Sequence, residues 1–239
     1  MEIKIIPCLQ DNYSYLMVDK ESNTACVIDP SESDPIIEYI ENNNIKLKFI
    51  LNTHHHYDHV GGNQELKKKY AASVIGYKED KKRIPEIDIL LNDQETWIHK
   101  NFEAKIIYIP GHTLGHICFY FYKEKVIFTG DTLFSLGCGR IYEGTYSQMF
   151  NSLMKLKELP QNTKVYCGHE YTKKNSDFCL MYDSNNENLK AKIRGIDAKL
   201  KSGLPTIPST IKDELECNIF LRSGNLETFS KLRDLKDNF

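Results

Sequence analysis

The sequence has no long apolar run. Among its 239 residues, no stretch approaches the roughly 20 apolar residues that a membrane-spanning helix needs. The apolar run in residues 1–6 is too short for a signal peptide, and the polar residues 10–12 follow at once. The sequence therefore predicts no membrane partner, and the opening residues are expected to form the first strand.

An excess of charge is also missing. Lys and Arg number 31, Asp and Glu number 33, and the formal net charge is -2. A general nucleic-acid-binding protein would usually be basic, so no nucleic-acid partner is expected. This balance still allows a small local cluster of basic residues.

Paired cysteine motifs are absent. The seven cysteines include no Cys-x-x-Cys pair, and their number is odd. This pattern disfavours a thiolate zinc site and fits free thiols in a reducing cytoplasm. Most of the cysteines are expected to be small residues of the core.

The chain otherwise has an ordinary globular composition, with 41% hydrophobic and 27% charged residues. Strands are expected at residues 2–6, 13–19, 24–29, 48–51, 73–77, 95–99, 104–109, 117–122, 125–128 and 163–167, the last of them. Helices are expected at residues 34–44, 63–70, 146–159, 173–181, 187–201, 211–216 and 226–235. Because only helical patterns follow residue 171, we expect one domain at 1–171 and a helical domain at 172–239.

The most informative segment is residues 53–59, Thr-His-His-His-Tyr-Asp-His, which follows a predicted strand. Alternate residues of an extended segment point the same way, so His54 and His56 can share one metal ion. A turn after His56 would direct Asp58 and His59 toward a second ion. A catalytic ion needs about three protein ligands and an open position for water, so two ions need more than these four residues.

Three further motifs supply candidate ligands, each of them after a predicted strand and beside a glycine. They contain His112 in Pro-Gly-His-Thr, Asp131 in Thr-Gly-Asp-Thr and His169 in Cys-Gly-His-Glu. A single loop histidine is usually an ordinary polar residue. So many polar residues in one loop have little structural use and risk uncompensated burial, so the whole set predicts a metal site.

The remaining histidines have other expected positions. His55 should point away from the ligands, and His99 should lie on the surface. His116 is a candidate for a hydrogen bond that supports a ligand from behind. Asp29 either has the same supporting role or forms an ordinary turn before Pro30.

In this order, the motifs resemble those of the metallo-β-lactamase superfamily. The resemblance implies an α/β (α+β) fold, a four-layer αββα sandwich with metals at one sheet edge, followed here by the C-terminal helical domain. It implies two divalent metal ions, zinc first, with iron or manganese as alternatives that also suit imidazole and carboxylate ligands. The implied ligands are His54, His56 and His112 for the first ion, Asp58, His59 and His169 for the second, and Asp131 as the bridge.

Within the superfamily, nearly the whole chain resembles the glyoxalase II family. Residues 137–145, Gly-Cys-Gly-Arg-Ile-Tyr-Glu-Gly-Thr, resemble its glutathione-contacting loop, and residues 232–239 resemble its C-terminal substrate-binding helix. The resemblance implies hydrolysis of S-(2-hydroxyacyl)glutathione thioesters, chiefly S-D-lactoylglutathione, by a metal-bridged hydroxide that Asp58 orients. The implied glutathione contacts are Arg140, Tyr142, Tyr171, Arg233 and Lys236.

Some residues depart from that pattern or have a simpler explanation. Residues 218–220, Asn-Ile-Phe, lack the proline of the family's Asn-Pro-Phe, and the stretch between Arg222 and Arg233 is short. The dipole of a helix favours cations in its last turn without any ligand, which would also account for Arg233 and Lys236.

Two alternatives stay open. The first is another enzyme of the superfamily, such as a glutathione persulfide dioxygenase. That enzyme needs only a three-ligand iron site, so a complete second set of ligands disfavours it. A non-catalytic metal-binding scaffold would be expected to have lost ligands, and all seven candidates are present. We expect a cytoplasmic monomer that acts on a small-molecule glutathione thioester.

Overall fold

A computed structural model of the chain describes all 239 residues. They form two compact units. Unit 1 comprises Met1–Tyr108 and Gly115–Glu124, and unit 2 comprises Ile109–Leu114 and Lys125–Phe239. No helix of the chain has the length and apolar character needed to cross a membrane.

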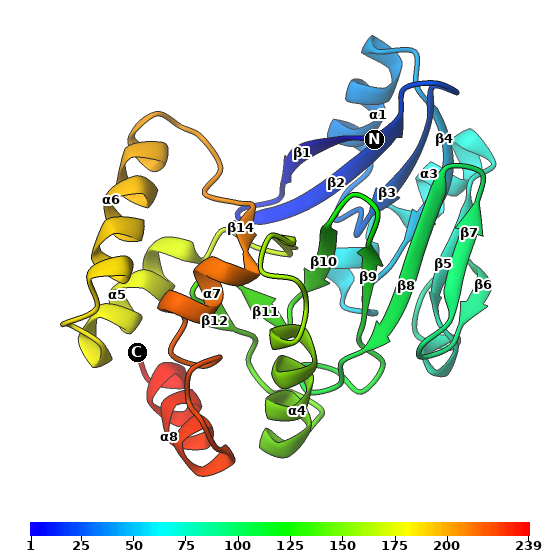
Figure 1. The fold of residues 1–239 in the computed structure, drawn as a ribbon. Coiled ribbons are helices and arrows are strands. Elements are labelled where there is room, and N and C mark those ends of the chain that lie inside the picture. Colours follow the sequence, from blue (N-terminus) through cyan, green and yellow to red (C-terminus); the bar gives the residue numbers. More distant parts are fainter. The chain divides into compact units, whose positions relative to one another are not determined.

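Unit 1 is built on a six-stranded mixed sheet (Figure 1). Its strands, in spatial order, are β1 (Glu2–Cys8), β2 (Asn12–Asp19), β3 (Thr24–Ile28), β4 (Lys46–Leu51), β5 (Ser73–Tyr77) and β6 (Ile87–Leu91). The first three pair antiparallel, and β3 to β6 run parallel. Every residue of β2 and β3 is buried, as expected for strands covered on both faces.

Two helices of unit 1 contribute side chains to the hydrophobic core that includes residues of this sheet. Helix α1 (Asp34–Asn42) contributes Ile36 and Ile40, and helix α3 (Asn63–Tyr70) contributes Leu66. The spacing of Ile36 and Ile40 places both side chains on one face of the helix. Unit 1 also contains a short helix α2 (Tyr57–Val60), a 3-10 turn η1 (Lys78–Asp80) and three antiparallel strands. These strands are β7 (Thr96–His99), β8 (Phe102–Tyr108) and β9 (Ile117–Phe121).

Unit 2 combines short strands with the C-terminal helices, which Figure 1 colours from yellow to red. Strand β10 (Val126–Gly130) pairs parallel with β13 (Lys164–Cys167), and β13 pairs antiparallel with β14 (Ser209–Thr210). Strands β11 (Leu133–Phe134) and β12 (Gly137–Cys138) form a hairpin. The helices are α4 (Tyr146–Lys157), α5 (Thr172–Tyr182), α6 (Glu187–Lys201), α7 (Ile211–Cys217) and α8 (Leu226–Asp237).

The predicted helices and strands are largely confirmed, with small differences at their ends. The prediction that residues 163–167 form the last strand was wrong, because β14 follows; two residues are too few to give a periodic pattern. Strands β6, β11 and β12 and helix α2 were not predicted. All seven cysteines are free and buried, and His99 is exposed, as expected. The boundary near residue 172 stays a prediction, since the two compact units follow a different division of the chain.

A buried carboxyl group ties α7 to the β11–β12 hairpin. Glu214 is fully buried, and its Oε2 accepts hydrogen bonds from the backbone N–H of Leu136 and from Asn218 Nδ2, each at 2.9 Å. Asn218 Nδ2 also donates to the carbonyl of Gly137 at 3.1 Å. Leu136 has a left-handed φ of 59°, so these bonds stabilise an unfavourable turn. Burial raises the pKa of Glu214 to about 7.

Glu214→Gln should therefore change how stability depends on pH. Because the pKa is raised on folding, the folded protein binds more protons than the unfolded chain between about pH 4 and pH 7. The wild-type free energy of unfolding therefore decreases as the pH rises from about 4 to about 7, because the proton that the folded protein binds more tightly is lost. The variant lacks the titration, so it should gain stability relative to wild type between pH 5 and pH 8, measured by chemical denaturation. Glu227→Gln, at a side chain 78% exposed, should show no such gain; an equal pH response in both variants would contradict the raised pKa.

Candidate metal centre and substrate cavity

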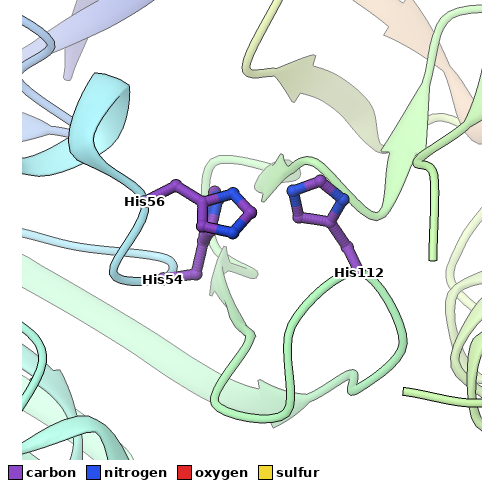
Figure 2. Close-up of side chains that lie close together, drawn as sticks. All are labelled: His54, His56 and His112. Atoms are coloured by element: carbon purple, nitrogen blue, oxygen red, sulfur yellow. The ribbon is translucent and has the colours of Figure 1, made fainter. Parts of the chain in front are cut away.

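The loop after β4 presents four of the predicted metal ligands. His54 is fully buried and His56 partly buried, and a ring nitrogen of one lies within 4.8 Å of a ring nitrogen of the other. Figure 2 shows both rings on this loop, and it also draws His112, which belongs to unit 2. The next turn is α2, where Asp58 Oδ2 lies 3.8 Å from His59 Nε2. The loop thus offers two pairs of donor side chains in sequence.

Asp29 fixes the orientation of this loop. Its carboxylate accepts hydrogen bonds from the backbone N–H and the hydroxyl of Thr53, each at 2.7 Å, and lies 3.0 Å from His59 Nδ1. Because the Thr53 hydroxyl donates to Asp29, it accepts from His54 Nδ1, 3.0 Å away. Protons on both Nδ1 atoms leave Nε2 of His54 and His59 with the lone pair that a metal requires.

Other side chains of unit 1 hold the same loop. Asn12, which the sequence did not single out, donates from Nδ2 to Asp58 Oδ2 at 3.0 Å and to the Asp58 carbonyl at 3.1 Å. His55 Nδ1 lies 3.2 Å from the buried carboxylate of Asp80. The His116 ring is stacked on His54, with 4.6 Å between ring centroids.

In unit 2, Asp131 lies between two predicted histidine ligands. Asp131 follows β10 directly and His169 follows β13, at the carboxyl ends of two parallel strands in which Gly130 pairs with Cys167. Asp131 Oδ2 is 3.4 Å from His112 Nε2 and 3.2 Å from His169 Nε2. One carboxylate oxygen therefore faces both imidazoles.

The hydrogen bond of His112 identifies the nitrogen available to a metal. His112 Nδ1 lies 2.7 Å from the carbonyl oxygen of Arg140, which can only accept, so Nδ1 is the donor. In the neutral ring, Nε2 then has a lone pair directed at the negative Asp131 oxygen. A divalent cation satisfies both atoms, and imidazole with carboxylate is a donor set suited to zinc, iron or manganese.

A cavity of about 330 Å³ in unit 2 is lined by all five residues predicted to contact substrate. They are Arg140, Tyr142, Tyr171, Arg233 and Lys236. Phe134, Cys138, Lys174 and Asn175 complete the lining. The sequence did not single out Lys174 and Asn175, which lie in the first turn of α5, just after Tyr171.

Two tyrosines connect this cavity with the candidate metal ligands. The Tyr171 ring is stacked on His169, with 4.7 Å between centroids and 5° between planes. The Tyr142 ring meets His112 edge-on at 5.3 Å. A molecule bound in the cavity would therefore lie beside both histidines.

The cavity is positively charged. Arg233, only 5% exposed, donates to the Cys138 carbonyl at 2.7 Å and pairs with Asp237 at 2.9 Å. Arg140 pairs with the same Asp237 oxygen at 3.2 Å, and this hydrogen bond raises the pKa of Arg140. Burial, together with the nearby charges of Arg233 and Lys174, lowers the pKa of Lys236 to about 8.

Comparison with known proteins identifies the class and then the family. The metallo-beta-lactamase superfamily profile matches residues 10–169, and the profile of the hydroxyacylglutathione hydrolase C-terminus matches residues 170–239. The chain therefore belongs to the metallo-β-lactamase superfamily and, within it, to the hydroxyacylglutathione hydrolase (glyoxalase II) family. Both the superfamily fold and the family expected from the sequence are thereby confirmed.

Individual relatives agree with this assignment. The hydroxyacylglutathione hydrolase of Pelagibacter ubique is 75% identical over 239 residues, and that of a Synechococcus species is 41% identical over 252 residues; each match covers 100% of both chains. The crystal structure of ETHE1 from Myxococcus xanthus matches with a TM-score of 0.75 and 21% identity, over 98% of this chain and 90% of that one. The last likeness establishes the fold alone.

Proposed function

We propose that the protein hydrolyses S-(2-hydroxyacyl)glutathione thioesters, chiefly S-D-lactoylglutathione, to a 2-hydroxy acid and glutathione. The observation that carries this proposal is the position of the cationic cavity beside His112 and His169. Glutathione is anionic, so a cluster of Arg and Lys is the charge complement that it requires. The names of the relatives, hydroxyacylglutathione hydrolase, describe the same chemistry.

We propose that two divalent metal ions assist the reaction, with zinc as the expected metal. His54, His56 and His112 would hold one ion, Asp58, His59 and His169 the other, and Asp131 would bridge them. The proposal is supported by Asp131 Oδ2, which lies near Nε2 of both His112 and His169, ligands of different ions in this assignment. When bound, such ions lower the pKa of a water from 15.7 to ~7 and polarise a carbonyl.

The residues of the chain then have defined roles. Asn12 restricts the rotation of Asp58 through two hydrogen bonds, so the Asp58 carboxylate can orient the attacking water. The water oxygen bonds to the acyl carbon, and the carbon–sulfur bond then breaks. One proton of the water stays with the new carboxyl group and the other passes to the sulfur through solvent, so the products are a carboxylic acid and a thiol. A thiol has a pKa of roughly 8.5, so the departing sulfur needs no dedicated acid near neutral pH.

We also propose a separate function for each of the two predicted domains. Residues 1–171 would form the catalytic domain, since they contain every candidate metal ligand. Residues 172–239 would form the glutathione-binding domain, since they contain Arg233 and Lys236. The seven free, buried cysteines fit a reducing cytoplasm, which cell fractionation would test.

The purified protein is expected to hydrolyse S-D-lactoylglutathione, followed at the thioester absorbance, with about two metal ions bound per chain. Chelation should abolish turnover, and returning zinc should restore it. Metal-loaded protein that leaves the thioester intact would overturn the proposed activity. Full turnover with about one ion per chain would overturn the binuclear centre alone.

Asp131→Ala should reduce metal content together with turnover, because its carboxylate would serve both ions. Metal analysis and the thioester assay on the same sample measure the two effects. His99→Ala, at an exposed histidine outside the site, should leave both values at the wild-type level. Retention of two ions and full activity in Asp131→Ala would rule out the bridge.

Arg233→Ala should lower kcat/KM for S-D-lactoylglutathione about 10- to 150-fold, the equivalent of a lost charge-assisted contact of about 1.5–3 kcal/mol. A thioester whose thiol part has no carboxylate should be affected much less. Arg222→Ala provides a control, because Arg222 pairs with Asp183 outside the cavity. Equal losses on both thioesters would show that Arg233 supports only the structure.

A further inference from the structure

Helix α5 carries two adjacent lysines in opposite electrostatic surroundings. Lys173 Nζ lies 3.0 Å from Asp177 Oδ1 and 3.3 Å from Asp197 Oδ1, so two carboxylates compensate its charge. Lys173 does not line the cavity, whereas Lys174 does. The Lys174 ammonium has no ion pair with any carboxylate of the chain. Only the second lysine therefore offers an uncompensated charge to a bound molecule.

The other cations of the cavity also differ in whether they have a carboxylate partner. Arg140 and Arg233 share one carboxylate, that of Asp237. Lys236 Nζ donates to the Lys174 carbonyl at 3.1 Å and has no carboxylate partner. Lys174 and Lys236 thus bring two ammonium groups to one cavity, and neither forms an ion pair with a carboxylate.

This arrangement is unfavourable while the cavity is empty. Burial, Arg233 and Lys174 lower the pKa of Lys236, whereas Cys179 and Asp177 act in the opposite direction. The Lys236 ammonium also lies over the rings of Phe178 and Phe239, at 5.0 and 4.7 Å from their centroids. An anion bound in the cavity would relieve the repulsion between the cations, so the cost of the empty state favours anionic ligands.

We propose that Lys174 is a specificity-determining residue, whose ammonium pairs with a second carboxylate of the thiol part of the substrate. The inference rests on the proposed function and extends it to a residue that the proposed contacts do not include. Glutathione carries two carboxylates. With Arg233 and Lys236 assigned to one of them, Lys174, which lines the same cavity, supplies a cation for the other.

The test compares Lys174→Ala with Lys173→Ala, which removes the same charge one residue away. Each metal-loaded protein is assayed on S-D-lactoylglutathione and on S-lactoyl-N-acetylcysteamine, whose thiol part has no carboxylate. Lys174→Ala should lower the ratio of the two kcat/KM values about fivefold, mainly by raising KM for the glutathione thioester. Lys173→Ala should keep the wild-type ratio, and Lys174→Arg should restore most of it.

A pH profile gives a second readout that a purely structural role would not change. Loss of the Lys174 charge relieves Lys236, so the pKa of Lys236 should rise in Lys174→Ala. In the wild type, the ratio of the two kcat/KM values should fall as pH rises, because Lys236 loses its positive charge. In Lys174→Ala this fall should occur at higher pH, whereas Lys173→Ala should follow the wild type. The ratio cancels the effect of any ionising group of the enzyme that changes the hydrolysis of both substrates equally.

Glutathione binding separates failure of this inference from failure of the proposed function. Calorimetry with glutathione should show about fivefold weaker binding to Lys174→Ala than to Lys173→Ala, whether or not the thioester is hydrolysed. Equal ratios and equal affinities in the two variants would overturn the role of Lys174. A wild-type protein without thioesterase activity would overturn the proposed function, and the calorimetric comparison would still decide the role of Lys174.

Discussion

The parallel pairing of β10 with β13 is the constraint on which the candidate centre depends. It brings the carboxyl ends of two strands that are far apart in the sequence to one edge, where Asp131 and His169 follow. His112 meets the same carboxylate oxygen from a third loop. A shift of this pairing by one residue would turn the side chains of one strand to the opposite face of the sheet, so the segments after the two strands would no longer bring Asp131 and His169 together.

Oxygen acceptors then decide which nitrogen each histidine presents. Asp29 and Thr53 engage Nδ1 of His59 and His54, and the carbonyl of Arg140 engages Nδ1 of His112. Arg140 has a second role, since its side chain lines the cationic cavity. The residue that orients a candidate metal ligand thus belongs to the segment proposed to bind substrate, so the two functions share one backbone loop.

The helices of unit 2 hold the wall of the cavity through the β11–β12 hairpin. Asn175 of α5 donates to the Ser135 carbonyl at 3.1 Å and packs so closely on Gly137 that a Cβ there would lie 2.4 Å from its Nδ2. From α7, the buried Glu214 holds Leu136. The hairpin therefore depends on polar contacts with two helices, which explains why so short a pair of strands keeps a defined position.

The amino-acid sequence was sufficient to predict the superfamily fold and to single out the candidate ligands, because their spacing is local and each follows a strand. It was not sufficient to predict the role of Asn12, which is 46 residues from its partner Asp58. Nor was it sufficient to predict the role of Lys174, which depends on the absence of the acidic partners that Lys173 has. Strand β14 escaped prediction for the same reason, since it exists only through its pairing with β13. Local spacing determines which residues are chemically able to act. The packing of distant segments decides which of them meet and which charges remain uncompensated.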